Sequence, residues 1–378
     1  MDRKIFDWVL KIFLFLSPVF LFQNYRASMA RGMFFILGVF ALYALSLTLE
    51  PKRKLNNLWV GLFLLLAFVR MFIDNSVCEQ PQMQWFNFWF SCASFMYVFC
   101  GVLLFQIVYT HAENIREYIK PIVWVCVINA ILTGAQLIGK DFLWYNAPSV
   151  CGFMENSSQL GQYSALAFPL VFFFNPLLSL IPLFTLIVSK SISPILACAI
   201  GMSVLCVLTK RNVLIIPIVL SCVILAGIAG TQYISNKWSA RPEIWQKTLR
   251  VSLQKPFVGY GYGSFTDKVS QVKESLSAGG PEHLRAHNDP LHTAQELGFP
   301  IVIVMGAFFF NLFKRFFTEH QEKMTYFLGA SILIVLINMC GQTFIRYAST
   351  AGTFIVVLAL FCVMVERGNH VIHKSPDM

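Results

Sequence analysis

The chain has 378 residues, of which 57% are hydrophobic and only 13% are charged. A soluble protein of this length could not bury so much apolar surface, so the composition excludes a soluble globular domain and indicates an integral membrane protein. The formal net charge of +10 does not require a nucleic acid partner, because the lysines and arginines cluster in short connections between hydrophobic runs and set membrane topology there.

Hydrophobic runs of about 17 to 22 residues recur along the chain, which is the length that crosses a bilayer as an α-helix. No small-residue cleavage site follows the first run, and another run begins at once, so we interpret it as a retained helix rather than a signal peptide. The sequence predicts one all-α membrane domain over residues 1–378, with about twelve spans. The predicted spans are 5–22, 30–49, 56–73, 86–109, 120–138, 158–174, 176–189, 194–209, 212–230, 292–313, 324–344 and 349–365.

The cations between the spans predict the orientation of the chain. If the N-terminus is cytoplasmic, the connections on that side carry most of the lysines and arginines, as the positive-inside rule requires. The opposite connections are poorer in cations and contain acids such as Asp74 and Glu79. Both termini are therefore predicted to be cytoplasmic. The cations on the predicted cytoplasmic side are Arg3, Lys4, Lys11, Lys52, Arg53, Lys54, Arg116, Lys120, Lys210, Arg211, Lys314, Arg315, Lys323, Arg367 and Lys374.

This orientation places the longest connection, residues 231–291, on the outer side of the membrane. Long connections inside a compact fold are usually functional or disordered. Pro242 suits a first helical turn and apolar residues follow it at helical spacing, so we expect an amphipathic helix at the outer interface, its apolar face toward lipid or the bundle. The spaced apolar residues are Ile244, Trp245, Leu249 and Leu253.

The ten cysteines show no Cys-x-x-Cys pair and no zinc-ligand spacing. Eight of them fall in predicted helices, where a thiol packs as a small hydrophobic group. Cys78 and Cys151 fall in outer connections, where an oxidising compartment would allow a disulfide. The sequence leaves open whether these two cysteines pair.

The segment 285–298 gathers an arginine, two histidines, an asparagine and carboxylates just before a hydrophobic run. Polar groups at the entrance of a membrane helix are the first candidates for chemistry. Because imidazole can accept a proton near neutral pH, His287 is a candidate general base. His292 follows it by five residues, which does not fit a helical zinc site, so no metal is predicted. The chain lacks a Gly-x-Ser-x-Gly nucleophile motif, so a hydrolase has little support.

A glycine pattern, Gly259-Tyr-Gly-Tyr-Gly263, lies earlier in the same connection. It follows a helix rather than a strand and lies outside, so it does not predict a nucleotide-binding loop. Two interpretations stay open. The segment is either a glycine-kinked turn with Tyr260 and Tyr262 packed at the interface, or a backbone that lets a bulky sugar or phosphate approach closely.

Several motifs follow one another along this part of the chain: Arg241-Pro-Glu-Ile-Trp245, then Pro256 with Gly259-Tyr-Gly-Tyr-Gly-Ser-Phe265, then His287-Asn288-Asp-Pro-Leu291 and Glu296-Leu-Gly298. Taken in order, they resemble the O-antigen ligase and polymerase family over residues 150–365. Gly152-Phe-Met-Glu-Asn156 looks like an earlier segment of the same family. Two positions depart from the family pattern: Ile301 replaces a glycine, and Lys190 stands where an arginine is usual, which keeps the charge but loses the bidentate fork. The family's shared pattern reads Arg-x-x-x-Trp, then Pro-x-x-Gly-x-Gly-x-Gly-x-Phe, then His-Asn-x-x-Leu followed by Glu-x-Gly.

The resemblance implies a polytopic glycosyltransferase of the bacterial inner membrane, similar in architecture to glycosyltransferase-C enzymes and acting on the periplasmic face. It implies a polyprenyl-pyrophosphate-linked glycan as donor and a sugar hydroxyl of lipid A-core as acceptor, with membrane lipids around the protein and no cofactor. The alternatives are an O-antigen or exopolysaccharide polymerase and a protein O-oligosaccharyltransferase. A transporter for the same lipid-linked glycans would need charged residues deep in several spans, where Arg70 is one of very few.

The chemistry of such a transfer assigns roles to named residues. A diphosphate leaving group gains negative charge, which the fixed cations Arg241, Arg285 and Lys190 would stabilise without a metal. His287 would deprotonate the acceptor hydroxyl, and direct displacement would invert the anomeric carbon because no covalent nucleophile is evident.

Three further residues receive supporting roles in this prediction. Asn288 could hydrogen-bond a sugar, and Glu296 would orient the histidine or cap the tenth helix. Arg346 is a further outer cation, for which a simple topological or lipid-headgroup role is the alternative. These polar segments are expected to cover a lateral cavity that lipid can enter.

Overall fold

The structure is a computed structural model that describes residues 2–19, 27–53, 81–140, 150–154, 156–209, 241–261, 264–265, 285–318 and 321–372. In these ranges all regular structure is α-helical and no strand occurs, as predicted. The helices are α1 (Arg3–Val19), α2 (Ala27–Ser46), α4 (Pro81–His111), α5 (Ile115–Leu137), α6 (Ser157–Phe174), α7 (Leu180–Val188), α8 (Ile192–Thr209), α10 (Arg241–Gln254), α12 (Asp289–Leu297), α13 (Phe299–Thr318), α14 (Lys323–Met339) and α15 (Ala348–Ile372).

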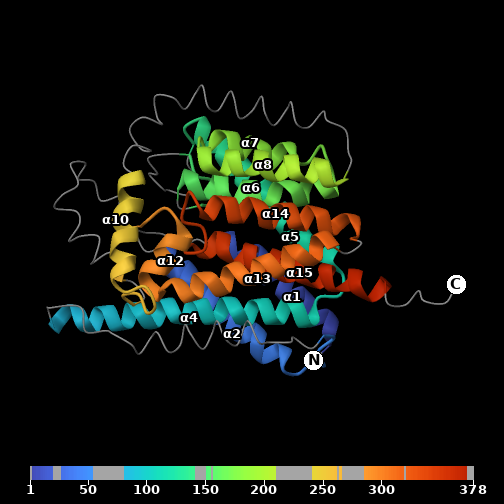
Figure 1. Cartoon of the computed structure of the whole chain (residues 1–378). Coiled ribbons are helices and arrows are strands. Elements are labelled where there is room, and N and C mark those ends of the chain that lie inside the picture. Colours follow the sequence, from blue (N-terminus) through green and yellow to red (C-terminus); the bar gives the residue numbers. More distant parts are fainter. Residues whose placement is uncertain are drawn as a thin grey trace.

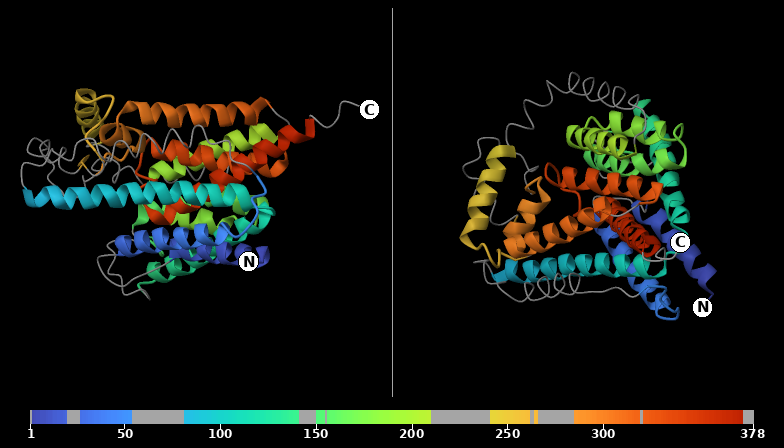
Figure 2. Two further views of the ribbon diagram at one scale, coloured as in Figure 1. Left: turned by 90° about the horizontal axis from the view of Figure 1, so that it is seen from below. Right: turned by 45° about the vertical axis from the view of Figure 1, so that its right-hand side comes forward.

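Most helices lie side by side in a bundle, and α10 lies across one end of it (Figure 1). Helix α15 is central: it packs against α1, α2, α4, α6, α13 and α14. Of the residues in its most apolar stretch, 78% are buried inside the protein, whereas only 17% are buried in the corresponding stretch of α13. Helix α13 accordingly lies at an edge of the bundle (Figure 2) and turns an apolar face outward, as a lipid-facing helix does.

Four stretches within the described ranges are long and apolar enough to cross a membrane: α5, α8, α13 and residues 350–367 of α15. They support the prediction of a membrane protein. The predicted spans 56–73 and 212–230 lie outside the described residues. The full number of twelve spans stays a prediction.

Two predicted spans differ from the structure. The span expected at 292–313 is interrupted, because α12 ends at Leu297 and Gly298 (φ +85°) separates it from α13. Glycine adopts this backbone conformation without steric cost, so the membrane span begins with α13 and α12 precedes it. In the region 176–189 the helix α7 has nine residues, which rise about 14 Å, about half the hydrocarbon thickness of a bilayer.

Connections that the sequence assigns to the same side gather at one end of the bundle. Arg3 and Lys52 both pair with Glu113, at 2.7 and 3.1 Å. Arg367, near the end of α15, donates to the Glu113 carbonyl at 3.0 Å. The opposite end holds α10 and α12, at the left of Figure 1. Helices joined by a described connection, such as α4 and α5 or α14 and α15, run in opposite directions between the two ends of the bundle, as the predicted topology requires. Which end faces the cytoplasm stays a prediction.

Helix α10 is the described helix within the long connection 231–291. It buries Ile244, Thr248 and Ser252 on the side that packs against α12, whereas Leu249 and Leu253 are exposed by 41% and 59%. The apolar residues expected to share one face are therefore divided between the bundle and the outer surface.

The structure does not test whether Cys78 and Cys151 form a disulfide, which the sequence left open. Cys151 is buried, and Cys78 lies outside the described residues.

Candidate functional site

The connection between α14 and α15, residues 340–347, is the point on which the motif residues converge; we call it the α14–α15 loop. Arg241 donates through Nη1 to the carbonyl of Gly341 at 2.8 Å. Asn288 donates through Nδ2 to the carbonyl of Cys340 at 2.9 Å. Two residues that lie 47 positions apart in the sequence thus bind neighbouring carbonyls of one loop.

The Arg-x-x-x-Trp pattern follows from the geometry of α10. Residues four apart lie on one face of a helix, so Arg241 and Trp245 both point toward the neighbouring segments. The Trp245 indole N–H donates to the carbonyl of Ala286 at 2.9 Å. The first two turns of α10 therefore hold both the α14–α15 loop and the backbone next to His287.

His287 is half-buried and has a left-handed backbone conformation, with φ +50°. Residues other than glycine adopt this conformation rarely, and it persists where neighbouring contacts enforce it. Here Trp245 binds the carbonyl of Ala286, the residue before His287. The residue after it, Asn288, is held by its own side-chain hydrogen bonds. The position of His287 is therefore set from both sides.

Asn288 is the N-cap of α12. Its Oδ1 accepts the N–H of Leu291 at 2.9 Å, while its amide nitrogen binds the α14–α15 loop. A side-chain cap of this kind satisfies one of the free N–H groups at a helix start. The structure thus gives Asn288 a structural role, and its predicted contact with a sugar is untested.

A buried ionic cluster lies along α12. Arg346 Nη2 donates to Glu296 Oε2 at 2.7 Å, and His292 Nε2 lies 3.3 Å from Glu296 Oε1. The Arg346 Nε lies 4.0 Å from Asp289 Oδ1. The side chains of Glu296 and Asp289 are 1% and 0% exposed, so the carboxylates depend on these partners rather than on water.

The protonation of this cluster follows from burial and charge. Burial by itself raises the pKa of Glu296, but Arg346 and then His292 outweigh it and lower that pKa to about 2. Burial, followed by the charge of Arg346, lowers the pKa of His292 to about 4. Near pH 7 the pair is therefore an ionised carboxylate and a neutral imidazole.

The cluster gives two predicted residues partners that the sequence did not suggest. Glu296 contacts His292 and Arg346 in the last turn of α12, and its predicted orientation of His287 is untested. Arg346 is held in an ion pair instead of lying as a separate outer cation. Their predicted contacts with substrate are untested.

The glycine pattern forms a turn that closes the break between α12 and α13. The N–H groups of Tyr260 and Gly261 donate to the carbonyls of Gln295 and Glu296, at 2.9 and 2.8 Å. They satisfy carbonyls that a helix end leaves free. A Cβ on Gly259 (φ +61°) would lie 2.5 Å from the Glu296 carbonyl carbon, so glycine is needed here for close approach of two protein segments.

Phe265, the last residue of the glycine motif, packs on the cluster. Its ring lies 4.2 Å from the His292 ring, centroid to centroid, and it is 1% exposed. Tyr262 and Gly263 lie outside the described residues. The structure supports the turn interpretation of this motif and leaves ligand approach untested.

Arg285 and Lys190, the other two predicted cations, have different surroundings. The Arg285 guanidinium carbon lies 4.2 Å from the centre of the Tyr347 ring, a cation–π contact with the α14–α15 loop. Lys190 is exposed at the end of α7, with φ +51°. Ser193, three residues later in the first turn of α8, binds Asn338 at the end of α14 at 3.1 Å, so Lys190 lies toward the same end of the bundle.

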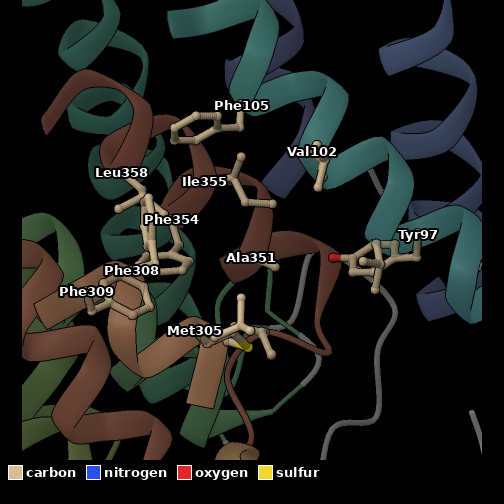
Figure 3. A pocket seen from close by; sticks show the side chains of 14 residues that line it. Tyr97, Val102, Phe105, Met305, Phe308, Phe309, Ala351, Phe354, Ile355 and Leu358 are labelled. Carbon is tan, nitrogen blue, oxygen red and sulfur yellow. The ribbon is translucent and has the colours of Figure 1, made fainter. Parts of the chain in front are cut away.

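One pocket reaches the α14–α15 loop, and another is lined in part by α12. The first, of about 230 Å³, lies between α4, α13 and α15 and is lined by hydrocarbon groups, including Phe105, Phe308 and Ile355, with the Tyr97 ring at one side (Figure 3). Its lining reaches Ile345 of the α14–α15 loop. A second pocket, of about 430 Å³, lies between α10, α12 and α13.

A comparison with protein families identifies the segment that carries most of these contacts. The model of a family described as O-antigen ligase matches residues 177–306. The predicted resemblance to this family is confirmed. The match runs from the turn before α7 into α13 and includes α10 and α12, and it is narrower than the range 150–365 expected from the motifs. No curated protein matches the chain.

Asp289 and Tyr347 are site residues that the sequence analysis missed. Asp289 had a local signal, because an acid directly after an N-cap residue is favoured by the helix dipole. Its loop partners lie more than 50 positions away, and no local pattern reports such a contact.

Proposed function

We propose that this chain transfers a glycan from a polyprenyl-pyrophosphate carrier to a sugar hydroxyl of lipid A-core, on the periplasmic side of the inner membrane. The observation that carries the proposal is the convergence of the O-antigen ligase motif residues on the α14–α15 loop. Arg241, Asn288 and Glu296 come from separate motifs, and each binds this loop. The family match supports an O-antigen ligase or polymerase type of activity.

Stabilisation of the leaving group falls to fixed cations. When the bond between the anomeric carbon and the phosphate oxygen breaks, the diphosphate takes the electron pair and its negative charge grows. Arg241 donates to a carbonyl, and Arg285 lies against an aromatic ring. Preorganised cations of this kind lower the barrier without a metal. Arg346 is already neutralised by Glu296 and is better suited to holding the site together, while the exposed Lys190 is a further candidate for the phosphates.

His287 is the proposed general base. It would take the proton of the acceptor hydroxyl as that oxygen bonds to the anomeric carbon, opposite the departing diphosphate. A single displacement of this kind inverts the configuration of the sugar. The contacts of Trp245 and Asn288 on either side of His287 support a role that requires a fixed position.

The hydrocarbon chain of the carrier needs an apolar place near the reacting phosphate. The pocket between α4, α13 and α15 (Figure 3) supplies one, because its walls are apolar and reach Ile345, the residue before Arg346. Helix α13, which lines the pocket, turns its other face outward, so a chain could enter sideways from the membrane.

The proposal is tested by transfer with purified protein in detergent. The protein receives a polyprenyl-pyrophosphate-linked glycan and lipid A-core, with EDTA present. We expect glycosylated lipid A-core with an inverted linkage and no loss of rate from EDTA. Extension of the donor glycan without use of lipid A-core would instead identify a polymerase. Movement of the donor across the membrane of vesicles that contain the protein, without any glycan transfer, would identify a transporter.

A further inference from the structure

Asp289 is a buried carboxylate to which the proposed chemistry gives no role. Its Oδ2 accepts the backbone N–H groups of Phe344 and Ile345, at 2.6 and 3.0 Å. The preceding residue, Asn288, binds the Cys340 carbonyl of the same loop. Two consecutive side chains after His287 therefore hold both ends of the stretch 340–345.

The surroundings of Asp289 fix it in one place. Its side chain is fully buried, and a buried carboxylate is tolerated only where hydrogen bonds and charges replace water. Here two N–H groups and the Arg346 guanidinium do so. Asp289 also occupies the first position of α12, where the helix dipole favours a negative charge.

We propose that Asp289 is a positioning residue of the transfer reaction, which acts by holding the α14–α15 loop against the start of α12. The loop carries the Gly341 carbonyl that receives Arg241 and the Tyr347 ring that receives Arg285. A shift of the loop would therefore move both cations of the proposed phosphate site together. This inference rests on the proposed function.

The expected loss falls on the chemical step. A misplacement of about 1 Å can cost roughly 100-fold in rate even when it starts away from the reacting atoms. We expect Asp289→Ala to lower kcat by roughly that factor, because the loop loses its anchor. Asp289→Asn keeps the shape and one oxygen that can accept the N–H groups, so it should recover part of the rate. KM for lipid A-core should change little in either variant.

A matched control is Glu117→Gln, which removes a carboxylate charge at the other end of the bundle. Glu117 pairs with Lys120 at 2.5 Å on the surface and lies far in sequence from every motif residue. Its transfer rate should equal that of the wild type. A loss in this control equal to that in Asp289→Asn would overturn the positioning role.

The loop itself can be followed without any activity, because Cys340 is exposed. Burial and then the charge of Asp289 raise the pKa of the Cys340 thiol. Maleimide labelling is measured against pH, and labelling that persists in Cys340→Ser protein is subtracted. Loss of the Asp289 charge should move the midpoint of the curve of labelling rate against pH to lower pH in both Asp289→Ala and Asp289→Asn. Release of the loop should raise the plateau labelling rate at high pH in Asp289→Ala alone.

Each outcome then decides the inference. A large fall in kcat together with a raised plateau in Asp289→Ala supports it. Full transfer by folded Asp289→Ala, or a fall in kcat with an unchanged labelling profile, overturns it. Absence of transfer by the wild type is a failure of the proposed function instead, and the labelling profile still reports whether Asp289 holds the loop.

Discussion

Glu296 is a carboxylate with a side-chain exposure of only 1%, and it depends on Arg346. Removal of one partner from a buried pair leaves an uncompensated charge, which costs about 3 to 5 kcal/mol. We predict that Arg346→Ala destabilises the protein by about 3 kcal/mol and that adding Glu296→Gln recovers part of this loss. Denaturant unfolding in detergent measures both effects.

The control for this pair is an exposed ion pair at the other end of the bundle. Lys52 pairs with Glu113, and both side chains are about half exposed. Exposed pairs contribute about 0 to 1 kcal/mol, so Lys52→Ala should change stability by less than about 1 kcal/mol. Equal losses in Arg346→Ala and Lys52→Ala would contradict the assignment of a buried cluster.

His292 predicts a dependence of stability on pH. Its pKa is lowered from 6.5 to about 4 by burial and by Arg346, so the unfolded chain takes up the proton first as the pH falls. His292 therefore removes stability as the pH falls from about 6.5 to about 4. Asp289, whose pKa burial raises to about 6, has the opposite effect over much of this range.

Because the effects of His292 and Asp289 on stability oppose each other, the wild type alone does not isolate His292. The informative quantity is the difference in stability between the wild type and His292→Gln. The stability of the wild type relative to His292→Gln should fall as the pH is lowered from 6.5 to 4. Unfolding curves of both proteins across this range give the difference directly. A constant difference would show that His292 has an ordinary pKa.

At the scale of elements, the glycine turn packs against the break after α12 so closely that the contact tolerates no side chain on Gly259. A Cβ on Gly259 would overlap the Glu296 carbonyl, and the residue has φ +61°. We predict that Gly259→Ala displaces the turn and abolishes transfer, with a stability loss of at least about 1 kcal/mol. Gly306→Ala is the control, because a Cβ there meets no atom within 4 Å and alanine favours the helix by up to about 1 kcal/mol.

How far the sequence predicts these elements depends on the range of the interaction. The start of α12 was readable from local chemistry, because Asn288 is a capping residue directly before it. The break at Gly298 was not predicted, although Gly298 and Pro300 are local signals of a helix end. The close approach of the distant Gly259 backbone, which also requires it, has no local signal. Helix α10 was predicted as one apolar face, but packing on α12 divided its apolar residues.

The site shows the same limit. The order of the motifs was enough to select Arg241, Asn288 and Glu296, but not their common partner. That partner, the α14–α15 loop, lies outside the motifs quoted for the family and makes its contacts across 50 to 100 residues. Arg346 was selected as a cation, and its pairing with Glu296 could not be read from composition or spacing.

At the scale of the whole molecule, the two ends of the bundle should face opposite sides of the membrane. We predict that a membrane-impermeant maleimide labels Cys340 in intact spheroplasts, whereas Lys52→Cys is labelled only after permeabilisation. Cys340→Ser and the protein without the Lys52 substitution are the respective controls. Labelling of both positions from the same side would contradict the topology.

In the proposed glycan transfer, His287 acts as the base. The most direct test of this role is transfer by wild type and by His287→Ala, each with polyprenyl-pyrophosphate glycan, lipid A-core and EDTA, repeated with added imidazole. We predict that the folded variant loses at least about 100-fold in rate, the usual contribution of a general base, and that imidazole restores part of it. Undiminished transfer by His287→Ala would contradict the account.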